Sequence, residues 1–208
     1  MRLIDAIQVK QGWFEIPDCS RNDLPEFFKA MGYKTGVEVG VWKGEFTEQF
    51  CLQGFRMYAV DPWAPYVDFK KKKGWPDDSL VDQEKFYRMA RQRLDKYPNC
   101  TIIRKTSMDA VNDFKDNSID FVYLDGHHGF RYIAEDLCEW TKKVRPGGII
   151  AGHDYLNSTE WSCHVAYVVD AYVRAFEIDN LYILGSAAPV VGEARDRERS
   201  WMWFRGEA

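Results

Sequence analysis

Residues 36–44 read Gly-Val-Glu-Val-Gly-Val-Trp-Lys-Gly, and the fold class can be inferred from them. The β-branched run 36–41 indicates a short strand that ends in a glycine turn. The segment 45–53 has helical composition and stops at Gly54, as is typical of a helix C-terminus. A strand that turns directly into a helix is the first half of a βαβ unit, and such units build parallel sheets.

The spacing of the glycines indicates which ligand this turn suits. Counted from Gly40, the third and sixth positions hold Trp42 and Glu45, so the turn lacks two glycines of the dinucleotide fingerprint. The pattern is instead acid-x-Gly-x-x-x-Gly, from Glu38 to Gly44. A glycine here lets a ligand approach the backbone, and an acid on the strand favours a cationic amine over a pyrophosphate. The alternative is a generic tight turn between a strand and a helix.

Strand patterns and helix patterns alternate along most of the chain. This alternation predicts a doubly wound α/β fold, with a mainly parallel sheet and helices on both faces. Ligands bind such sheets beyond the carboxyl ends of the strands, so the candidate functional residues follow the strand ends. The expected strands are 36–41, 56–61, 100–105, 119–124, 149–152, 181–184 and 201–204, and the expected helices are 22–32, 45–53, 80–97, 109–114, 131–144 and 161–176, with a turn at 146–148.

Asp61 ends the second expected strand and precedes Pro62. In dinucleotide folds an acid at this place, about 20 residues after the glycine turn, accepts the hydroxyls of a ribose. The separation from Gly40 to Asp61 fits that spacing. The alternative is a surface or capping aspartate ahead of Pro62. Because the glycine turn and Asp61 occur in register, we favour a nucleoside site.

Ionisable groups converge after the fourth and fifth expected strands. One interpretation is general-base catalysis, in which a histidine or aspartate takes a proton from a hydroxyl. A second is a divalent metal held by carboxylates and imidazole, which lowers the pKa of a hydroxyl. A third is that single members only cap loops and helices. The set is Asp125, His127 and His128 after 119–124, with His153 and Asp154 after 149–152.

The segment 63–79 is longer than a usual connection, and such loops often carry function. We therefore treat it as a substrate-side loop. Its four consecutive lysines, Lys70 to Lys73, either recruit an anionic substrate or form a solvated surface. Aromatic residues that could either line a substrate site or pack in the core are Trp63, Tyr66, Trp75, Tyr155 and Trp161.

The composition fits a single domain. The chain has 208 residues, of which 46% are hydrophobic and 15% aromatic, and a net charge of −4. We expect one domain over 1–208, with an N-terminal extension over 1–23. The charge argues against a nucleic-acid partner, and no apolar stretch reaches the roughly 18 residues that a membrane span needs. The five cysteines are scattered without a Cys-x-x-Cys pair and no signal peptide is evident, so we expect a cytoplasmic protein.

The chain resembles the class I S-adenosylmethionine (SAM)-dependent methyltransferases. Residues 124–130, Leu-Asp-Gly-His-His-Gly-Phe, and 135–137, Glu-Asp-Leu, are similar to the Ile-Asp-Gly-Asp-His-Ser-Tyr…Ala-Asp-Leu signature of the macrocin O-methyltransferase-like branch. Residues 144–148, Val-Arg-Pro-Gly-Gly, and 152–155, Gly-His-Asp-Tyr, also match that branch. The resemblance covers roughly residues 24–205. It implies a Rossmann-like sheet of seven strands, mostly parallel, with the last strand antiparallel.

The resemblance also implies how SAM is held. Residues of the glycine turn surround the methionine end, the acid after the second strand binds the ribose, and the segment after the third strand borders the adenine. The implied cofactor-binding residues are Glu38, Gly40, Val41, Trp42 and Gly44 in and around the turn, Asp61 and Pro62, Thr106, Ser107 and Met108, and Asp125, Gly126 and His127.

In macrocin-type relatives an acid at the Asp125 position and two adjacent acids after the fifth strand bind magnesium. Here the adjacent pair is His153 and Asp154, so the implied metal ligands are Asp125, His153 and Asp154. The histidine disfavours magnesium, which leaves another divalent ion or a metal-free histidine base. The expected catalytic residues are Asp125, His128 and His153.

We therefore expect a SAM-dependent methyltransferase that methylates an oxygen of a small molecule, sugar or glycan. Methyl transfer is an in-line displacement, so the enzyme mainly positions its reactants, and a histidine-rich rim favours an alcohol acceptor. One alternative is a nicotinamide-dependent oxidoreductase, against which the missing glycines argue. Another is a non-catalytic SAM-binding subunit. A homodimer is a state that the sequence leaves open.

Overall fold

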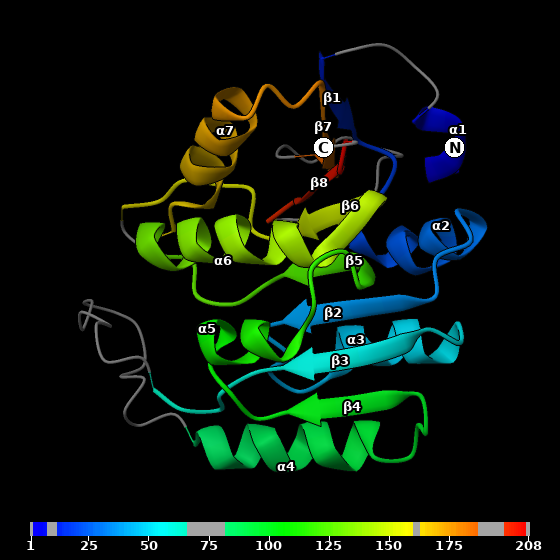
Figure 1. The fold of residues 1–208 in the computed structure, drawn as a ribbon, viewed down its shortest axis with the longest axis vertical. Coiled ribbons are helices and arrows are strands. Elements are labelled where there is room, and N and C mark those ends of the chain that lie inside the picture. Colours follow the sequence, from blue (N-terminus) through cyan, green and yellow to red (C-terminus); the bar gives the residue numbers. More distant parts are fainter. Residues whose placement is uncertain (1, 8–11, 66–81, 160–162, 187–197, 207–208) are drawn as a thin grey trace.

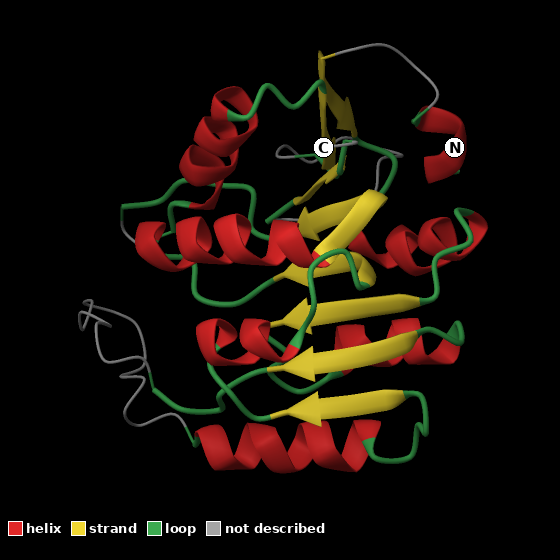
Figure 2. Cartoon of the chain, viewed as in Figure 1, coloured by secondary structure: helices red, strands yellow, loops and turns green. Residues whose placement is uncertain are grey.

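A sheet of eight strands organises the part of the chain that the computed structural model describes, namely residues 2–7, 12–65, 82–159, 163–186 and 198–206. The strand order is β1-β7-β8-β6-β5-β2-β3-β4, with helices on both faces (Figures 1 and 2). The strands are β1 (Gly12–Ile16), β2 (Thr35–Val39), β3 (Arg56–Val60), β4 (Cys100–Ile103), β5 (Ile119–Leu124), β6 (Val144–Gly152), β7 (Asn180–Leu184) and β8 (Ser200–Phe204).

The helices occupy the connections between these strands, except α1, which precedes β1. They are α1 (Leu3–Ala6), α2 (Leu24–Ala30), α3 (Glu45–Leu52), α4 (Gln83–Leu94), α5 (Ser107–Ala110), α6 (Phe130–Lys143) and α7 (Val165–Ala175), with short 3-10 turns η1 (Arg21–Asp23) and η3 (Val111–Asp113). Across the described residues, no helix combines the length and the apolar character that a bilayer crossing requires.

The sheet is parallel except at β8, which pairs antiparallel with β6 on one side and β7 on the other. This confirms the predicted doubly wound fold and the antiparallel last strand. The number of strands was wrong: the sheet has eight, because Gly12–Ile16 of the N-terminal extension adds β1 parallel to β7. Those five residues, Gly-Trp-Phe-Glu-Ile, are too short and too mixed in polarity to indicate a strand by pattern alone.

Side chains that alternate along β5 enter two different cores. Val122 and Leu124 pack with α5, α6 and α7, whereas Phe121 and Tyr123 pack with α2 and α3. All four are buried, as a strand covered on both faces requires. The predicted apolar strand 119–124 is confirmed with these bounds.

Three local predictions were wrong. The Pro-Gly-Gly stretch at 146–148 is not a turn before a strand but an irregular part of β6, which begins at Val144 opposite Ile119. The helix expected from Asn22 begins instead with η1, and its cap is a reciprocal pair formed by Ser20 and Asp23. The helix α5 also begins at Ser107, ahead of the predicted start at 109.

The carboxyl ends of the central strands meet at one edge of the sheet, where the arrowheads of β2, β3, β4 and β5 lie together in Figure 1. The switch point lies at β2, whose neighbours β3 and β5 follow it on opposite sides. Ligand sites of doubly wound sheets lie at this point. The loops after β2, β3, β5 and β6 therefore form the candidate site.

One acid is buried between α5 and α6, below this edge. Asp136 is 3% exposed, and its Oδ1 accepts a hydrogen bond from the Ser107 hydroxyl. That hydroxyl accepts in turn from Nε1 of Trp140, at 2.8 Å. Burial raises the pKa of Asp136 to about 7, although the bond from Ser107 opposes the shift.

The raised pKa of Asp136 makes stability depend on pH. The unfolded chain releases this proton near pH 4, whereas the folded protein keeps it to about pH 7, so stability falls as pH rises through that window. Between pH 4.5 and pH 8, we expect the free energy of unfolding of the wild type to fall by a few kcal/mol more than that of Asp136→Asn. Urea denaturation at both pH values measures it.

The control is Asp116→Asn, which changes an exposed aspartate paired with Lys143. Parallel pH profiles for the wild type and Asp136→Asn would contradict the assignment of a buried, protonated Asp136.

Candidate active site

The turn after β2 lies directly against the loop after β5. A Cβ added to Gly40 would overlap the backbone of Asp125 and Gly126, and Gly40 has a φ of +90°. Hydrogen bonds hold the approach: the amide of Asp125 donates to the Val39 carbonyl at 2.7 Å. Glycine is therefore required at position 40 by both space and backbone conformation.

Gly44 ends the same turn and starts α3. Its φ is +77°, and a Cβ there would lie 2.9 Å from a methyl carbon of Leu94 on α4. In the acid-x-Gly-x-x-x-Gly pattern, Gly40 thus allows the close approach of two backbones, and Gly44 adopts the left-handed backbone conformation that precedes α3. Both are structural requirements of this turn.

Glu38 lies below the turn. It is 2% exposed, and the Thr47 hydroxyl of α3 donates a hydrogen bond to its carboxyl group. Burial raises the pKa of Glu38 well above its ordinary value, while the bond from Thr47 opposes that shift and the nearby Asp125 adds to it. The first acid of the motif is therefore part of the support for the turn.

Asp61 joins the turn after β2 to the turn after β3. Its Oδ2 accepts hydrogen bonds from the amides of Val41 and Trp42, each at 2.9 Å, and its Oδ1 accepts from the amide of Trp63 at 2.7 Å. Burial raises the pKa of Asp61, and these three amides partly offset the effect. Pro62 follows, beyond the end of β3 at Val60. The carboxylate thus fixes the geometry of both turns.

The two tryptophans bound by Asp61 have left-handed backbones, with φ values of +50° at Trp42 and +42° at Trp63. Such a conformation costs a bulky residue about 1–3 kcal/mol, and it persists where surrounding contacts hold it. Here Nε1 of Trp63 also donates to the Trp42 carbonyl at 2.8 Å. Trp63 is buried, whereas the Trp42 ring is 53% exposed above the strand ends.

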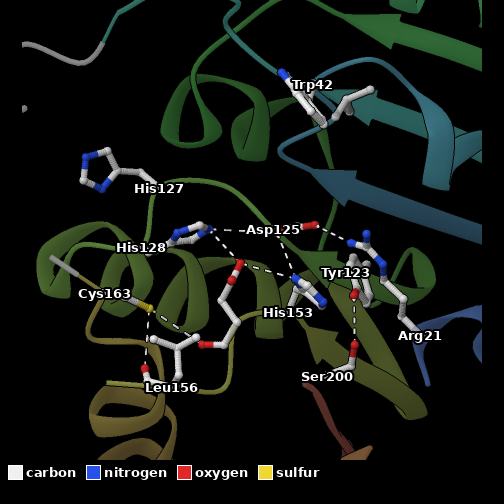
Figure 3. A network of polar contacts seen from close by, with 12 residues as sticks. Arg21, Trp42, Tyr123, Asp125, His127, His128, His153, Leu156, Cys163 and Ser200 are labelled. Atoms are coloured by element: carbon white, nitrogen blue, oxygen red, sulfur yellow. Dashed lines mark hydrogen bonds and ion pairs between the residues drawn. The ribbon is translucent and has the colours of Figure 1, made fainter. Parts of the chain in front are cut away.

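The polar cluster predicted after β5 and β6 forms a contact network (Figure 3). Nε2 of His128 lies 3.0 Å from Oδ2 of Asp154, and Nδ1 of His153 lies 3.3 Å from the same oxygen. Both nitrogens lie 3.9 Å from Oδ1 of Asp125. The structure thus brings together Asp125, His128, His153 and Asp154.

The backbone around Asp154 is unusual and well fixed. Its φ is +55°, in the left-handed region, where aspartate is tolerated better than most residues. The thiol of Cys163 points to the carbonyls of Asp154 and Leu156, at 3.7 and 3.4 Å. Nε1 of Trp201 on β8 donates to the His153 carbonyl at 2.9 Å. The antiparallel strand therefore helps to place the loop after β6.

The protonation of the cluster follows from burial and mutual contact. Burial raises the pKa of Asp125 to about 6, although His153, His128 and Arg21 oppose the shift. Burial opposes protonation of His128, but Asp154 and Asp125 outweigh it, so the pKa of His128 is raised. Burial likewise opposes ionisation of Asp154, but the two histidines lower its pKa overall. A site with such perturbed groups suits proton transfer.

Three members of the cluster form a candidate metal site. One ligand atom from each of Asp125, His128 and Asp154 lies within 4.8 Å of the others. Two carboxylates and an imidazole suit a divalent transition metal better than magnesium. The imidazole ligand of this candidate metal site is His128, whereas the sequence resemblance implied His153. Nδ1 of His153 nevertheless lies beside the same two acids, Asp125 and Asp154.

Other predicted site residues have different positions. His127 turns away from the cluster, with its ring 4.1 Å from that of Tyr132 (Figure 3). Thr106 caps α5 by accepting from the amide of Asp109, and Met108 packs against the core. Ser107 is bonded to Asp136 and Trp140, so its hydroxyl points into the fold. Gly126 lies beside the Gly40 turn.

The aromatic candidates divide between the core and segments that the structure leaves undescribed. Trp63 packs against Tyr87, and the Tyr155 hydroxyl donates to Asp170 at 2.6 Å. Both are core residues. Tyr66, Trp75 and Trp161 lie outside the described residues, as do Lys70 to Lys73 and most of the loop 63–79.

The sequence missed Arg21, which reaches the site from the N-terminal segment. Its Nη1 lies 3.3 Å from Oδ2 of Asp125. The extension 1–23 gave no strand or ligand pattern, so the residue received no role. The signal that could have located it is the Ser-x-x-Asp capping box from Ser20 to Asp23, which fixes the local chain.

Solved structures with similar folds include methyltransferases of several kinds. An O-methyltransferase from Bacillus cereus, in complex with SAH, has a TM-score of 0.63 at 13% identity, covering 88% of this chain and 78% of that one. An rRNA methylase from Streptococcus thermophilus has a TM-score of 0.60 at 14% identity, covering 89% and 96%. The N-methyltransferase NodS from Bradyrhizobium japonicum has a TM-score of 0.56 at 12% identity, covering 90% and 95%. At these identities the likeness shows the fold alone.

Sequence comparisons agree with this fold. The uncharacterised protein y4gI of Sinorhizobium fredii (strain NBRC 101917 / NGR234) is 25% identical over 97 residues, which is 47% of this chain but only 10% of that relative. A family model described as a methyltransferase domain matches residues 37–155, from β2 to the loop after β6. That span contains the glycine turn, Asp61 and the whole Asp-His cluster. The chain belongs to this family of methyltransferase domains.

Proposed function

We propose that the protein transfers the methyl group of SAM to an oxygen of a small molecule, sugar or glycan. The proposal rests on the family membership together with one observation. Asp125 touches the glycine turn through its backbone and the histidine cluster through its side chain. A cofactor over the turn therefore has its reactive end beside groups that accept protons.

The cofactor is expected to lie across the carboxyl ends of β2 and β3. In the proposal, the methionine end lies over the Gly40 turn and the ribose hydroxyls meet Asp61. The adenine follows toward Thr106, Ser107 and Met108, of which the Ser107 hydroxyl points inward to Asp136. The sulfonium then lies near Asp125.

The chemistry requires alignment and removal of one proton. The acceptor oxygen forms a bond to the methyl carbon while the methyl–sulfur bond breaks. The electron pair of the broken bond stays on sulfur, which gives S-adenosylhomocysteine (SAH). The hydroxyl proton passes to the cluster, where His128 and His153 lie near two carboxylates. Positioning lowers the barrier by holding the reactants in line.

The cluster can act in two ways. A divalent ion held by Asp125, His128 and Asp154 would lower the pKa of the acceptor hydroxyl. Without an ion, a histidine beside Asp154 is the base. The proximity of the three donor atoms favours the first form.

Two rival functions make different demands on the site. A nicotinamide-dependent oxidoreductase would need a turn that suits a pyrophosphate, and positions 42 and 45 hold Trp42 and Glu45 in place of glycine. A non-catalytic SAM-binding subunit would need no acid–base groups beside the turn. The partly buried Asp-His cluster favours a catalyst over both.

Cofactor binding is the first test of the proposal. We expect the wild type to bind SAH in the micromolar range by isothermal titration, and Gly40→Ala to lose binding because a Cβ displaces the Asp125 loop. Gly206→Ala is the control, since a Cβ there meets nothing within 4 Å. Far-ultraviolet circular dichroism confirms folding of each variant. A wild type that is folded but does not bind would remove the proposal.

The role of the cluster is tested by two matched substitutions. We expect His128→Asn to lower methyl transfer by about 100-fold or more, the usual scale of general acid–base catalysis. His164→Asn, outside the cluster, should keep near wild-type turnover because an amide oxygen can replace the acceptor of the Phe130 amide. Transfer of labelled methyl to sugars, nucleotide sugars and phenols measures both. Equal turnover in the two variants would place the chemistry elsewhere.

Metal binding is tested without turnover. We expect the wild type to bind one equivalent of Mn²⁺ in a calorimetric titration, and Asp154→Asn to weaken it by about tenfold or more through loss of a ligand. Asp113→Asn, an exposed acid paired with Lys105, is the control. No Mn²⁺ binding by the wild type would contradict the metal form and leave the histidine base.

A further inference from the structure

The turn over residues 41–44 has a backbone conformation that needs support from its surroundings. The amide of Gly44 donates to the Val41 carbonyl at 2.8 Å, which closes a four-residue turn. Within this turn, Trp42 has a φ of +50° and Gly44 a φ of +77°. A bulky residue keeps such a conformation only where the surrounding contacts fix it. The shape of the turn therefore depends on the side chains that bind its amides and carbonyls.

Asp61 fixes the first half of the turn. Its Oδ2 accepts hydrogen bonds from the amides of Val41 and Trp42, each at 2.9 Å. Both amides precede the peptide unit that joins Lys43 to Gly44. The orientation of that unit therefore depends on other contacts.

Arg93 of α4 binds the second half of the turn. Its Nε donates to the Lys43 carbonyl at 3.1 Å, while the Gly44 amide of the same peptide unit donates to the Val41 carbonyl. Because a peptide unit is planar and trans, these two bonds together set its orientation. The next residue of α4, the fully buried Leu94, lies against Gly44. Two consecutive residues of α4 thus contact the turn.

Acids of α3 hold the guanidinium of Arg93 in place. Its Nη1 lies 2.9 Å from Oε2 of Glu48, and its Nη2 lies 3.3 Å from Oε1 of Glu45. Glu48 also meets Nζ of Lys96 and the Tyr97 hydroxyl, each at 2.9 Å. Burial opposes the ionisation of Glu48, but these bonds lower its pKa to about 2, so its carboxylate is charged at neutral pH. The guanidinium is therefore anchored on α3 while its Nε points to the turn.

We propose that Arg93 is a positioning residue for the cofactor turn and the counterpart of Asp61. This inference rests on the proposed function. The carboxylate binds two amides in the first half of the turn, and the guanidinium binds a carbonyl in the second half. Each charge thus meets a backbone group of opposite polarity, and such charge-assisted hydrogen bonds are stronger than neutral ones. Arg93 acts on cofactor binding through the backbone of the turn, from a helix that does not follow a strand end of the site.

The chain offers a matched control in Lys96. It pairs with the same Glu48 carboxylate from the segment after α4, at 2.9 Å, and has no role in the proposed site. Arg93→Gln and Lys96→Gln each remove one positive charge that pairs with α3. The pair with Glu45 is also lost in Arg93→Gln, but that acid is 60% exposed, and exposed ion pairs contribute little. The difference between the two variants therefore measures the bond to the Lys43 carbonyl.

Isothermal titration with SAH measures the effect on binding. We expect Arg93→Gln to weaken SAH binding by about tenfold or more, the scale of a hydrogen bond from a charged group. Lys96→Gln should change the affinity less than about twofold. Arg93→Lys keeps a cationic donor on α4 and should recover part of the affinity. Thermal unfolding confirms that each variant is folded.

Hydrogen–deuterium exchange of the protein without ligand reports on the turn itself. We expect the amides of residues 41–44 to exchange faster in Arg93→Gln than in the wild type, and at the wild-type rate in Lys96→Gln. A general loss of stability would also speed exchange in the buried strand β5. We therefore expect the amides of β5 to exchange at the wild-type rate in both variants.

Three results would overturn the inference. They are unchanged SAH affinity in Arg93→Gln, equal weakening in Arg93→Gln and Lys96→Gln, and weaker binding without faster exchange of the turn. The second result would assign the effect to the pairing of α3 with α4. Failure of the folded wild type to bind SAH would instead remove the proposed function, and the exchange rates would still show whether Arg93 holds the turn.

Discussion

The backbone of Gly40 lies so close to the backbone of Asp125 that no side chain fits between them, and the arrangement of the site depends on this contact. It places the loop after β5 against the turn after β2, at the switch point of the sheet. Asp61 completes the constraint by binding amides of the turns after β2 and β3. With these turns fixed, Asp125 has one carboxylate oxygen toward Arg21 and the other toward the histidines.

Much of the fold follows from the sequence because most strands are short apolar runs bounded by glycine, proline or aspartate. The strand 119–124 was predicted with its observed bounds, since six residues that are buried on both faces leave a continuous signal. The edge strand β1 was missed because its order comes from pairing with β7, which is distant in sequence. The Pro-Gly-Gly stretch misled for a related reason: it forms the irregular part of β6 between two pairs with β5, Ile119–Val144 and Phe121–Ile149, and this long-range pairing extends the strand to Val144.

The site was predictable to the extent that topology determines it. Parallel strands put their carboxyl ends at one edge, so Asp125, His153 and Asp154 could be grouped from strand ends alone. Side-chain direction could not be obtained in this way: His127 turns to Tyr132 while its neighbour His128 joins the acids. Arg21 enters from a segment outside the alternating pattern, and only the folded chain brings it to Asp125.

In the proposed binding mode, the Gly40 turn and Asp61 hold the two ends of one sulfonium nucleoside, with its sulfur beside Asp125. A crystal structure of the protein grown with SAH tests this most directly. Density is expected across the ends of β2 and β3, with the amino-acid end over the Gly40 turn and the ribose at Asp61. A nucleoside bound elsewhere, or a pyrophosphate compound that occupies the turn in its place, would contradict it.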